Sequence, residues 1–354
     1  MRLFKCQNCG QVLFFENTSC GRCRRHLGYL PLEGELSALE PDVTEWEPLA
    51  RKGTTWRFCE NARKNVCNWM IPLESRERFC VACRHNRTVP DLSMSANVLA
   101  WTKLESAKHR MFYTLLRLGL PTPNRIDDPQ GGLVFDFLAD PTGPDAQKVM
   151  TGHDDGLITL ALAEADDPER EARRARMGEP YRTLLGHFRH EVGHFYWDLL
   201  VRDGKRIEKF RAVFGDERAD YMQALQWHYQ SGPPPYWQDH FVSSYATSHP
   251  WEDWAESWAH YLHIVDSLET AAAFGLEVRP GIDTEGVLSV TTRLDPYVEE
   301  RFDAMAQVWS PLTVALNAMN QSMGQGDLYP FVLSSAVITK LSFIHDLMRE
   351  QRGG

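Results

Sequence analysis

The chain has 354 residues, of which 43% are hydrophobic and 24% are charged, so it has room for two globular domains. The formal net charge of −10 is uneven, because residues 1–90 carry a net +4 and the remainder carries −14. The acidic body argues against general nucleic-acid binding, and no run of about 18 apolar residues predicts a membrane span. The N-terminus lacks the apolar segment of a secretion signal. We therefore expect a cytoplasmic protein with reduced cysteines.

All eight cysteines lie in the first 83 residues and form two groups of four. The first group consists of two C-x2-C pairs: Cys6, Cys9, Cys20 and Cys23. The second group has one wider pair and one C-x2-C pair: Cys59, Cys67, Cys80 and Cys83. Two such pairs can complete a tetrahedral shell of thiolates around zinc, and the metal then supplies folding energy to a small module. We predict two structural zinc sites in a zinc-ribbon-like region, residues 1–92. Disulfide bonds are the alternative, which the missing export signal disfavours.

Basic residues crowd both cysteine groups, for example Arg24 and Arg25 near the first and Arg84 and Arg87 near the second. Such a cluster can contact nucleic acid. More often it is a solvated face that also stabilises thiolates, and we favour that interpretation. We expect the ribbons to bind a protein partner or to position a substrate.

The segment Pro90–Ser93 marks a domain boundary, because the cysteines stop there and helical periodicity begins. We expect a helix over Trp101–Leu118, and a charged helix over Pro168–Met177. Between them lie three short β-like runs, separated by Gly, Pro and Asp: Leu133–Leu138, Lys148–Thr151 and Leu157–Leu162. The last run is a candidate edge strand that could pair with an extended peptide; an ordinary strand inside a sheet is the alternative.

The motif His190-Glu191-Val192-Gly193-His194 lies in a helix that we predict over Tyr181–Val201. Two histidines four residues apart project from one helix face, so both imidazoles can bind one zinc ion. Glu191 then stands beside the metal as a general base. We expect Gly193 to leave room for a ligand or a substrate.

A catalytic zinc usually has three protein ligands, and the best downstream candidates follow Pro250. Glu252 and Glu256 are four residues apart on a predicted helix, so one can bind zinc while the other accepts a hydrogen bond from the spare N–H of a ligand histidine. Glu217 is the rival third ligand. Lone histidines are more often structural.

Five helices are expected after the metal helix: Lys205–Phe214, Glu217–Tyr229, Asp253–Leu268, Pro296–Met319 and Pro330–Arg349.

The histidine motif is followed by Tyr245 and then, seven residues after the tyrosine, by the pair Glu252 and Glu256. This order resembles that of the gluzincin class of metallopeptidases. The stretch is similar to the catalytic domain of anthrax lethal factor over about 70 residues. That resemblance implies that His190, His194 and Glu252 bind zinc and that Glu191 is the general base. It further implies that Glu256 supports a ligand histidine, and that Tyr245 donates a hydrogen bond to the oxyanion.

Over nearly its whole length the chain resembles a bacterial family of zinc-binding metallopeptidases that carry an N-terminal zinc ribbon. The segments Leu184–Glu191 and His249–Glu256 carry the likeness, together with Cys6–Gly10 and Leu27–Pro31. The resemblance implies an α+β fold, with a ribbon module before a zincin-like domain, residues 93–354, of a small sheet and many helices. It implies one catalytic and two structural zinc ions, and a peptide or protein substrate. A catalytically silent or regulatory binding protein, associated with nucleic acid, is the alternative.

Overall fold

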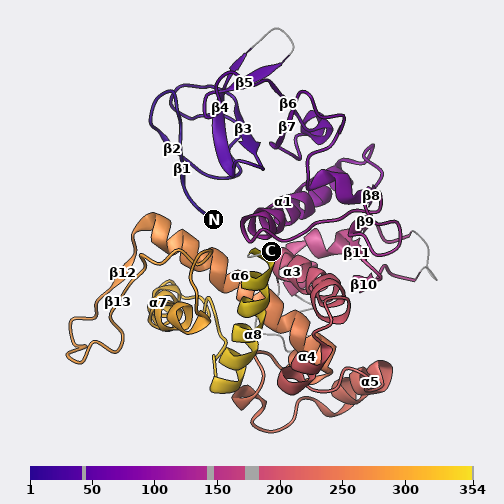
Figure 1. Ribbon diagram of the computed structural model, residues 1–354, viewed down its shortest axis with the longest axis vertical. Coiled ribbons are helices and arrows are strands. Elements are labelled where there is room, and N and C mark those ends of the chain that lie inside the picture. Colours follow the sequence, from indigo (N-terminus) through magenta and orange to yellow (C-terminus); the bar gives the residue numbers. More distant parts are fainter. Residues whose placement is uncertain (42–44, 142–146, 172–182, 353–354) are drawn as a thin grey trace. The chain divides into compact units, whose positions relative to one another are not determined.

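The computed structural model describes residues 1–41, 45–141, 147–171 and 183–352. The chain divides into two compact units, Met1–Arg170 and Glu171–Gly354. All the larger sheets belong to the first unit and most helices to the second, which confirms the predicted α+β class (Figure 1). Within the described residues, no helix is both long enough and apolar enough to cross a membrane.

The first unit begins with a small hairpin and an antiparallel sheet of five strands in sequential order, β3-β4-β5-β6-β7. The strands are β1 (Phe4–Lys5), β2 (Val12–Leu13), β3 (Leu27–Leu30), β4 (Glu35–Pro41), β5 (Trp46–Pro48), β6 (Trp56–Phe58) and β7 (Met70–Pro72). Gly28 on β3 lies so close to Met70 that a Cβ atom there would clash with its sulfur. These short strands serve mainly to hold the loops that carry the cysteines.

The rest of the first unit is one long helix and a mixed sheet in the order β10-β11-β9-β8. Its elements are β8 (Asn86–Thr88), α1 (Ser95–Arg117), β9 (Val134–Leu138), β10 (Gly152–Asp154) and β11 (Leu157–Ala161). An aromatic cluster of Phe15, Tyr29, Trp69 and Tyr113 packs α1 against the cysteine-bearing loops. Those loops therefore share a core with α1.

Two expectations about this sheet are wrong. The third β-like run, β11, is not an edge strand, because it pairs with β9 on one side and β10 on the other. Its backbone groups are already used, so β11 cannot accept a peptide by strand addition. The second run is also misplaced: β10 forms at Gly152–Asp154 instead of Lys148–Thr151, because the turn at Asp155 and Gly156 sets its register with β11.

The second unit is built around α3 (Leu184–Trp197), which packs chiefly on α6 (Pro250–Phe274) (Figure 1). A π-helical turn, η4 (Asp198–Arg202), extends α3. The remaining elements are α4 (Ile207–Phe214), α5 (Tyr221–Ser231), η5 (Trp237–Asp239), η6 (Tyr245–Thr247), β12 (Glu277–Val278), β13 (Val290–Thr291), α7 (Phe302–Ser322) and α8 (Ser335–Arg352). All six helices expected from Tyr181 onward are present, with ends shifted by a few residues. Most of the charged helix expected over Pro168–Met177 lies outside the described residues.

Local capping explains where the two central helices begin. The Thr183 side chain accepts a hydrogen bond from the amide of Gly186 at the start of α3. His249 caps α6 by accepting from the amide of Trp251, and Pro250 occupies the first helical position, where a missing N–H costs nothing. The caps therefore set the starting points of both helices that carry the metal-centre residues.

Gly193 has a different role from the one expected. A Cβ atom at this position would lie 3.1 Å from the Cα atom of Ala255 and 3.1 Å from Cδ1 of Trp258. The indole N–H of Trp254 also donates to the Gly193 carbonyl at 2.8 Å. The missing side chain thus lets α3 and α6 approach closely, and the space is filled by α6 instead of by a ligand.

Candidate metal centre

Three predicted ligand residues meet between α3 and α6. Nε2 of His190 lies 3.0 Å from Oε2 of Glu252, and Nε2 of His194 lies 3.6 Å from the same oxygen. One ligand atom from each residue lies within 4.8 Å of the others. Nitrogen and oxygen ligands on a tetrahedral zinc are about 3.4 Å apart, given metal–ligand bonds of about 2.1 Å. The spacing of these three donors therefore fits one zinc ion.

The hydrogen-bond pattern around His190 also calls for a cation. Its Nδ1 lies 2.7 Å from Oε1 of Glu256, and a carboxylate can only accept, so Nδ1 carries a proton. In a neutral ring, Nε2 would then direct a lone pair at Glu252. Burial opposes a charged imidazole, but hydrogen bonds and charges of Glu252 and Glu256 outweigh it and raise the pKa of His190 well above its ordinary value. The lone pair of Nε2 and the carboxylate of Glu252 would repel each other unless a positive charge lies between them, and a zinc ion can supply that charge.

Glu256 supports the centre from behind His190. Its Oε1 accepts from Nδ1 of His190, and its Oε2 accepts from the hydroxyl of Ser243 at 2.6 Å. Burial acts to raise the pKa of Glu256, but the hydrogen bond and charge of His190 lower it below its usual value. An ionised carboxylate at this point fixes the tautomer and orientation of the imidazole.

Two tyrosines border the same site. The hydroxyl of Tyr221, the first residue of α5, donates to Oε1 of Glu252 at 2.6 Å and so leaves Oε2 for the histidines. The ring of Tyr245 on η6 lies 5.9 Å from that of His190. Burial and the negative charge of Glu252 raise the pKa of both phenols above the usual value. Both hydroxyl groups are therefore protonated donors at neutral pH.

The other candidate ligands have different partners. Glu217 forms a two-pronged ion pair with Arg211, at 2.6 and 3.0 Å. His249 caps α6, and Nδ1 of His260 lies 2.7 Å from the Tyr329 hydroxyl in the core. Glu191 is half-buried on α3, one residue from His190.

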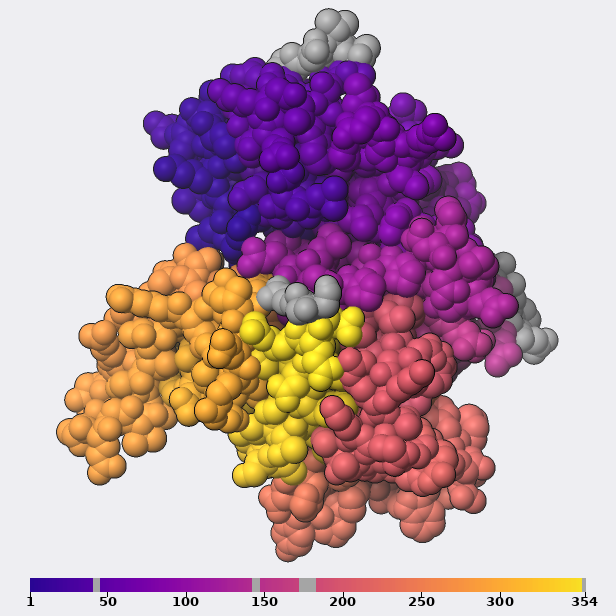
Figure 2. Space-filling model, in the orientation of Figure 1, coloured from indigo at the N-terminus to yellow at the C-terminus, as the bar shows by residue number. Residues whose placement is uncertain are grey.

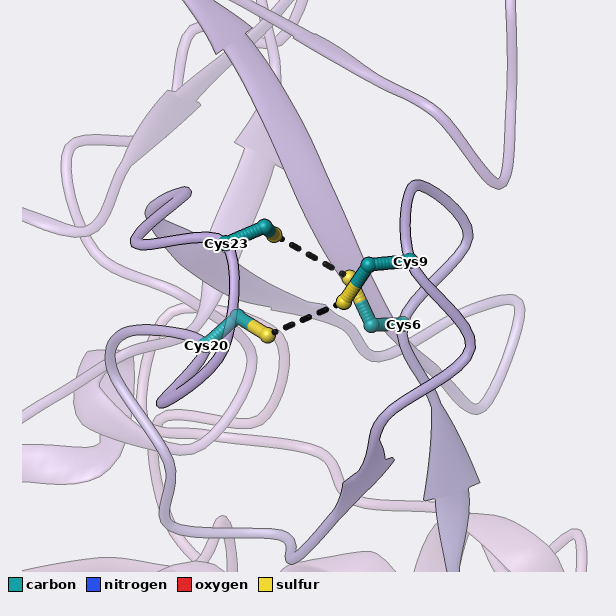
Figure 3. A group of neighbouring side chains, drawn as sticks. All are labelled: Cys6, Cys9, Cys20 and Cys23. Atoms are coloured by element: carbon teal, nitrogen blue, oxygen red, sulfur yellow. Dashed lines mark hydrogen bonds between the residues drawn. The ribbon is translucent and has the colours of Figure 1, made fainter.

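The first four cysteines converge from two loops (Figure 3). The sulfur of Cys6 lies 3.7 Å from that of Cys23, and the sulfur of Cys9 lies 3.6 Å from that of Cys20. Zinc–sulfur bonds of about 2.3 Å in a tetrahedron separate the sulfurs by about 3.8 Å. The four thiols are therefore already arranged as a tetrathiolate zinc site.

The second four cysteines also gather, although one of their pairs is widely spaced in sequence. The sulfurs of Cys67 and Cys80 are 3.8 Å apart. His109 of α1, a histidine outside the predicted site residues, borders the group: its Nε2 lies 3.3 Å from the sulfur of Cys67 and 3.5 Å from that of Cys83. Its Nδ1 faces the backbone carbonyl of Glu105 at 2.7 Å, which orients the ring. No spacing pattern connects a lone histidine 26 residues beyond Cys83 with this cluster.

Replacing His109 with alanine should weaken metal retention at the second cysteine group by about 10- to 100-fold, as is typical for a residue that supports metal ligands. The reason is that the imidazole contacts two of the four sulfurs. Transfer of zinc to a chromogenic chelator measures the effect, and the first group serves as an internal control in the same chain. Equal release from variant and wild type would exclude this role.

The comparisons with known proteins agree with this arrangement. Residues 97–347 match the family described as "putative zinc-binding metallo-peptidase", and residues 3–94 match a zinc-ribbon domain. Uncharacterized proteins of Mycobacterium bovis and Mycobacterium tuberculosis are each 42% identical over 351 residues, covering 99% of this chain and 96% of theirs. No solved structure was found to match.

The chain thus belongs to this zinc-binding metallopeptidase family, and its N-terminal part is a zinc ribbon. The peptidase match begins within the first compact unit, so it includes nearly all of α1 and strands β9–β11 as well as the helical unit, whereas β8 lies in the zinc-ribbon match. The predicted resemblance to this family is confirmed.

Proposed function

We propose that the chain is a zinc-dependent peptidase whose zinc is held by His190, His194 and Glu252. The observation that carries the proposal is the meeting of two imidazoles and a carboxylate that is 1% exposed, from α3 and α6, beside Glu191. A buried carboxylate is costly unless it is paired or binds a metal. Family membership supports the same chemistry.

Zinc at this position would act as a Lewis acid and lower the pKa of water towards about 7. Glu191 would accept a proton from the attacking water and deliver it to the leaving nitrogen of the peptide. The hydroxyl groups of the two neighbouring tyrosines would have different roles. Tyr221 holds Glu252 in place, and Tyr245 offers its O–H to the oxygen of the tetrahedral intermediate.

Tyr245→Phe should lower kcat by about 100- to 1000-fold with little change in KM, because the lost donor acts only when negative charge develops on the substrate oxygen. Steady-state kinetics on a cleaved peptide tests this. Tyr236→Phe, at a tyrosine that is 81% exposed, is the matched control. An unchanged rate in the Tyr245 variant would remove this residue from the site.

Tyr221→Phe should weaken zinc binding at the peptidase site by about tenfold, in the lower range for residues that support ligands. The variant loses only the oxygen that donates to Glu252. Competition with a metal chelator gives the affinity. Unaltered affinity, with an altered kcat, would instead give Tyr221 a direct part in catalysis.

We further propose one catalytic and two structural zinc ions, with the latter in the two cysteine groups. The ribbon module, residues 1–92, would recruit a protein partner or the substrate, and residues 93–354 would form the peptidase domain. Thiolate sites require reduced cysteines, which suits a cytoplasmic location. A silent scaffold protein is the second candidate; the retained Glu191, which binds no metal in this scheme, favours an active enzyme.

The test is cleavage of an unbiased peptide library by the zinc-loaded chain, read by mass spectrometry. Peptide cuts by the wild type that are absent with Glu191→Gln support the proposal. A zinc-loaded wild type that cuts no peptide would favour the binding protein.

A further inference from the structure

Helix α5 contacts Glu252 of the metal centre at its start and the η6 turn that carries Tyr245 near its end, but it buries none of its own residues. At its start, Tyr221 donates to Glu252. Two turns later, the Nδ1 atom of His228 lies 3.2 Å from the hydroxyl of Thr247, and its ring lies 6.0 Å from that of Tyr245. The helix is therefore fixed relative to the site, although it contributes nothing to the core.

A cavity of about 840 Å³ lies along this helix. One wall is a face of α5, with residues at helical spacing from Asp220 to Ser231; the others are the loop Gly232–Pro235 and the pair Thr247–Ser248. Thr247 and Ser248 follow Tyr245 after one residue, Ala246. His228 also lines the cavity, and its ring contacts that of Tyr245, so the cavity adjoins the proposed oxyanion donor. In Figure 2 the segment of residues 219–235 lies at the edge of the second unit.

The lining is mostly uncharged, in a chain whose formal net charge is −10, and it combines apolar residues such as Trp227 and Pro233–Pro235 with neutral polar ones. Trp227 lines the cavity and is 70% exposed, although tryptophan is usually well buried. Asp220 is the one carboxylate in the lining, and it already caps α5 by accepting from the amide of Gln223. Burial lowers the pKa of His228, so the ring is neutral at neutral pH.

Besides His228 and Ser231, the polar side chains in the α5 wall are the amides of Gln223, Gln226 and Gln230. An amide side chain both donates and accepts, as a peptide backbone requires. Gln223 and Gln230 are seven residues apart, which is about 10 Å along a helix. An extended peptide rises about 3.3 Å per residue, so the row matches about three residues of substrate.

We propose that this groove binds the substrate of the peptidase as an extended, uncharged peptide segment. An apolar or aromatic side chain packs on Trp227, and the glutamine amides pair with the peptide backbone. The inference rests on the proposed function, because it treats the groove as the approach to the metal centre. It replaces strand addition to β11 as the mode of substrate binding.

The experiment uses the full chain with Glu191→Gln, zinc-loaded and immobilised, to capture peptides from a random decapeptide library without cutting them. We expect captured peptides to be depleted in charged residues and enriched in an apolar or aromatic residue at one position. Adding Trp227→Ala should reduce capture by about tenfold, the effect of removing a central tryptophan contact. Met222→Ala is the matched control, since Met222 is exposed on α5 but outside the groove.

Three results would overturn the proposal that this groove binds the substrate. They are capture of mainly charged peptides, no capture at all, and equal capture by the Trp227→Ala and Met222→Ala variants. Cleavage by the wild type decides the proposed function separately. Peptide cleavage without a preference for apolar residues would support the peptidase proposal and contradict the proposed role of the groove. Peptide capture without cleavage by the wild type would support a peptide-binding groove and contradict peptidase activity.

Discussion

Glu191→Gln is expected to abolish peptide cleavage while the chain keeps its full zinc content. Glutamine has the shape of glutamate but cannot accept a proton, so the attacking water loses its base. General-base catalysis typically contributes 10²- to 10⁴-fold, which sets the expected loss in kcat. The metal should stay because His190, His194 and Glu252 are untouched. Steady-state kinetics and elemental analysis of the same preparation measure both effects.

Glu217→Gln is the matched control for this variant, since it makes the same chemical change at a residue paired with Arg211. It should leave kcat unaltered. Loss of zinc from the Glu191 variant would show that Glu191 is a ligand and not the base. Undiminished cleavage would mean that another group activates the water.

Glu252→Ala is expected to remove the peptidase zinc almost completely and to leave the metal in the cysteine groups. The carboxylate is the only acidic member of the three-donor group, and its loss leaves two histidines that cannot complete the usual three-ligand site. Glu256→Ala should weaken affinity by only about 10- to 100-fold, because Glu256 acts through His190.

Elemental analysis after gel filtration, followed by chelator competition, separates the two glutamates. The expected pattern is one zinc ion fewer per chain for Glu252→Ala and a full but weaker complement for Glu256→Ala. The reverse pattern would exchange their roles. Equal and complete retention in both variants would place the third ligand elsewhere.

The sequence predicts those parts of the site that depend on spacing along one helix. Histidines four residues apart on α3, and glutamates four residues apart on α6, share a face whatever the rest of the fold does. The C-x2-C pairs are equally local. Helices were predictable for the same reason, because apolar periodicity marks them over many residues.

Contacts that depend on tertiary packing were not predictable. Tyr221 and Ser243 reach the metal centre from segments with no metal-ligand pattern, and His109 reaches the second cysteine group from a helix. The role of Gly193 depends on α6 lying against α3. The position of β11 inside its sheet depends on both neighbouring strands, which its own short apolar run cannot indicate.

The most direct test of the central claim is the metal dependence of cleavage by the wild-type chain. The peptidase zinc is removed with a chelator under conditions that leave the cysteine groups loaded, and zinc is then titrated back against a peptide library. We predict that cleavage disappears with the metal and returns in proportion to the first equivalent of zinc. Cleavage that persists in the chelated chain, or a fully reloaded chain that cuts nothing, would contradict the account.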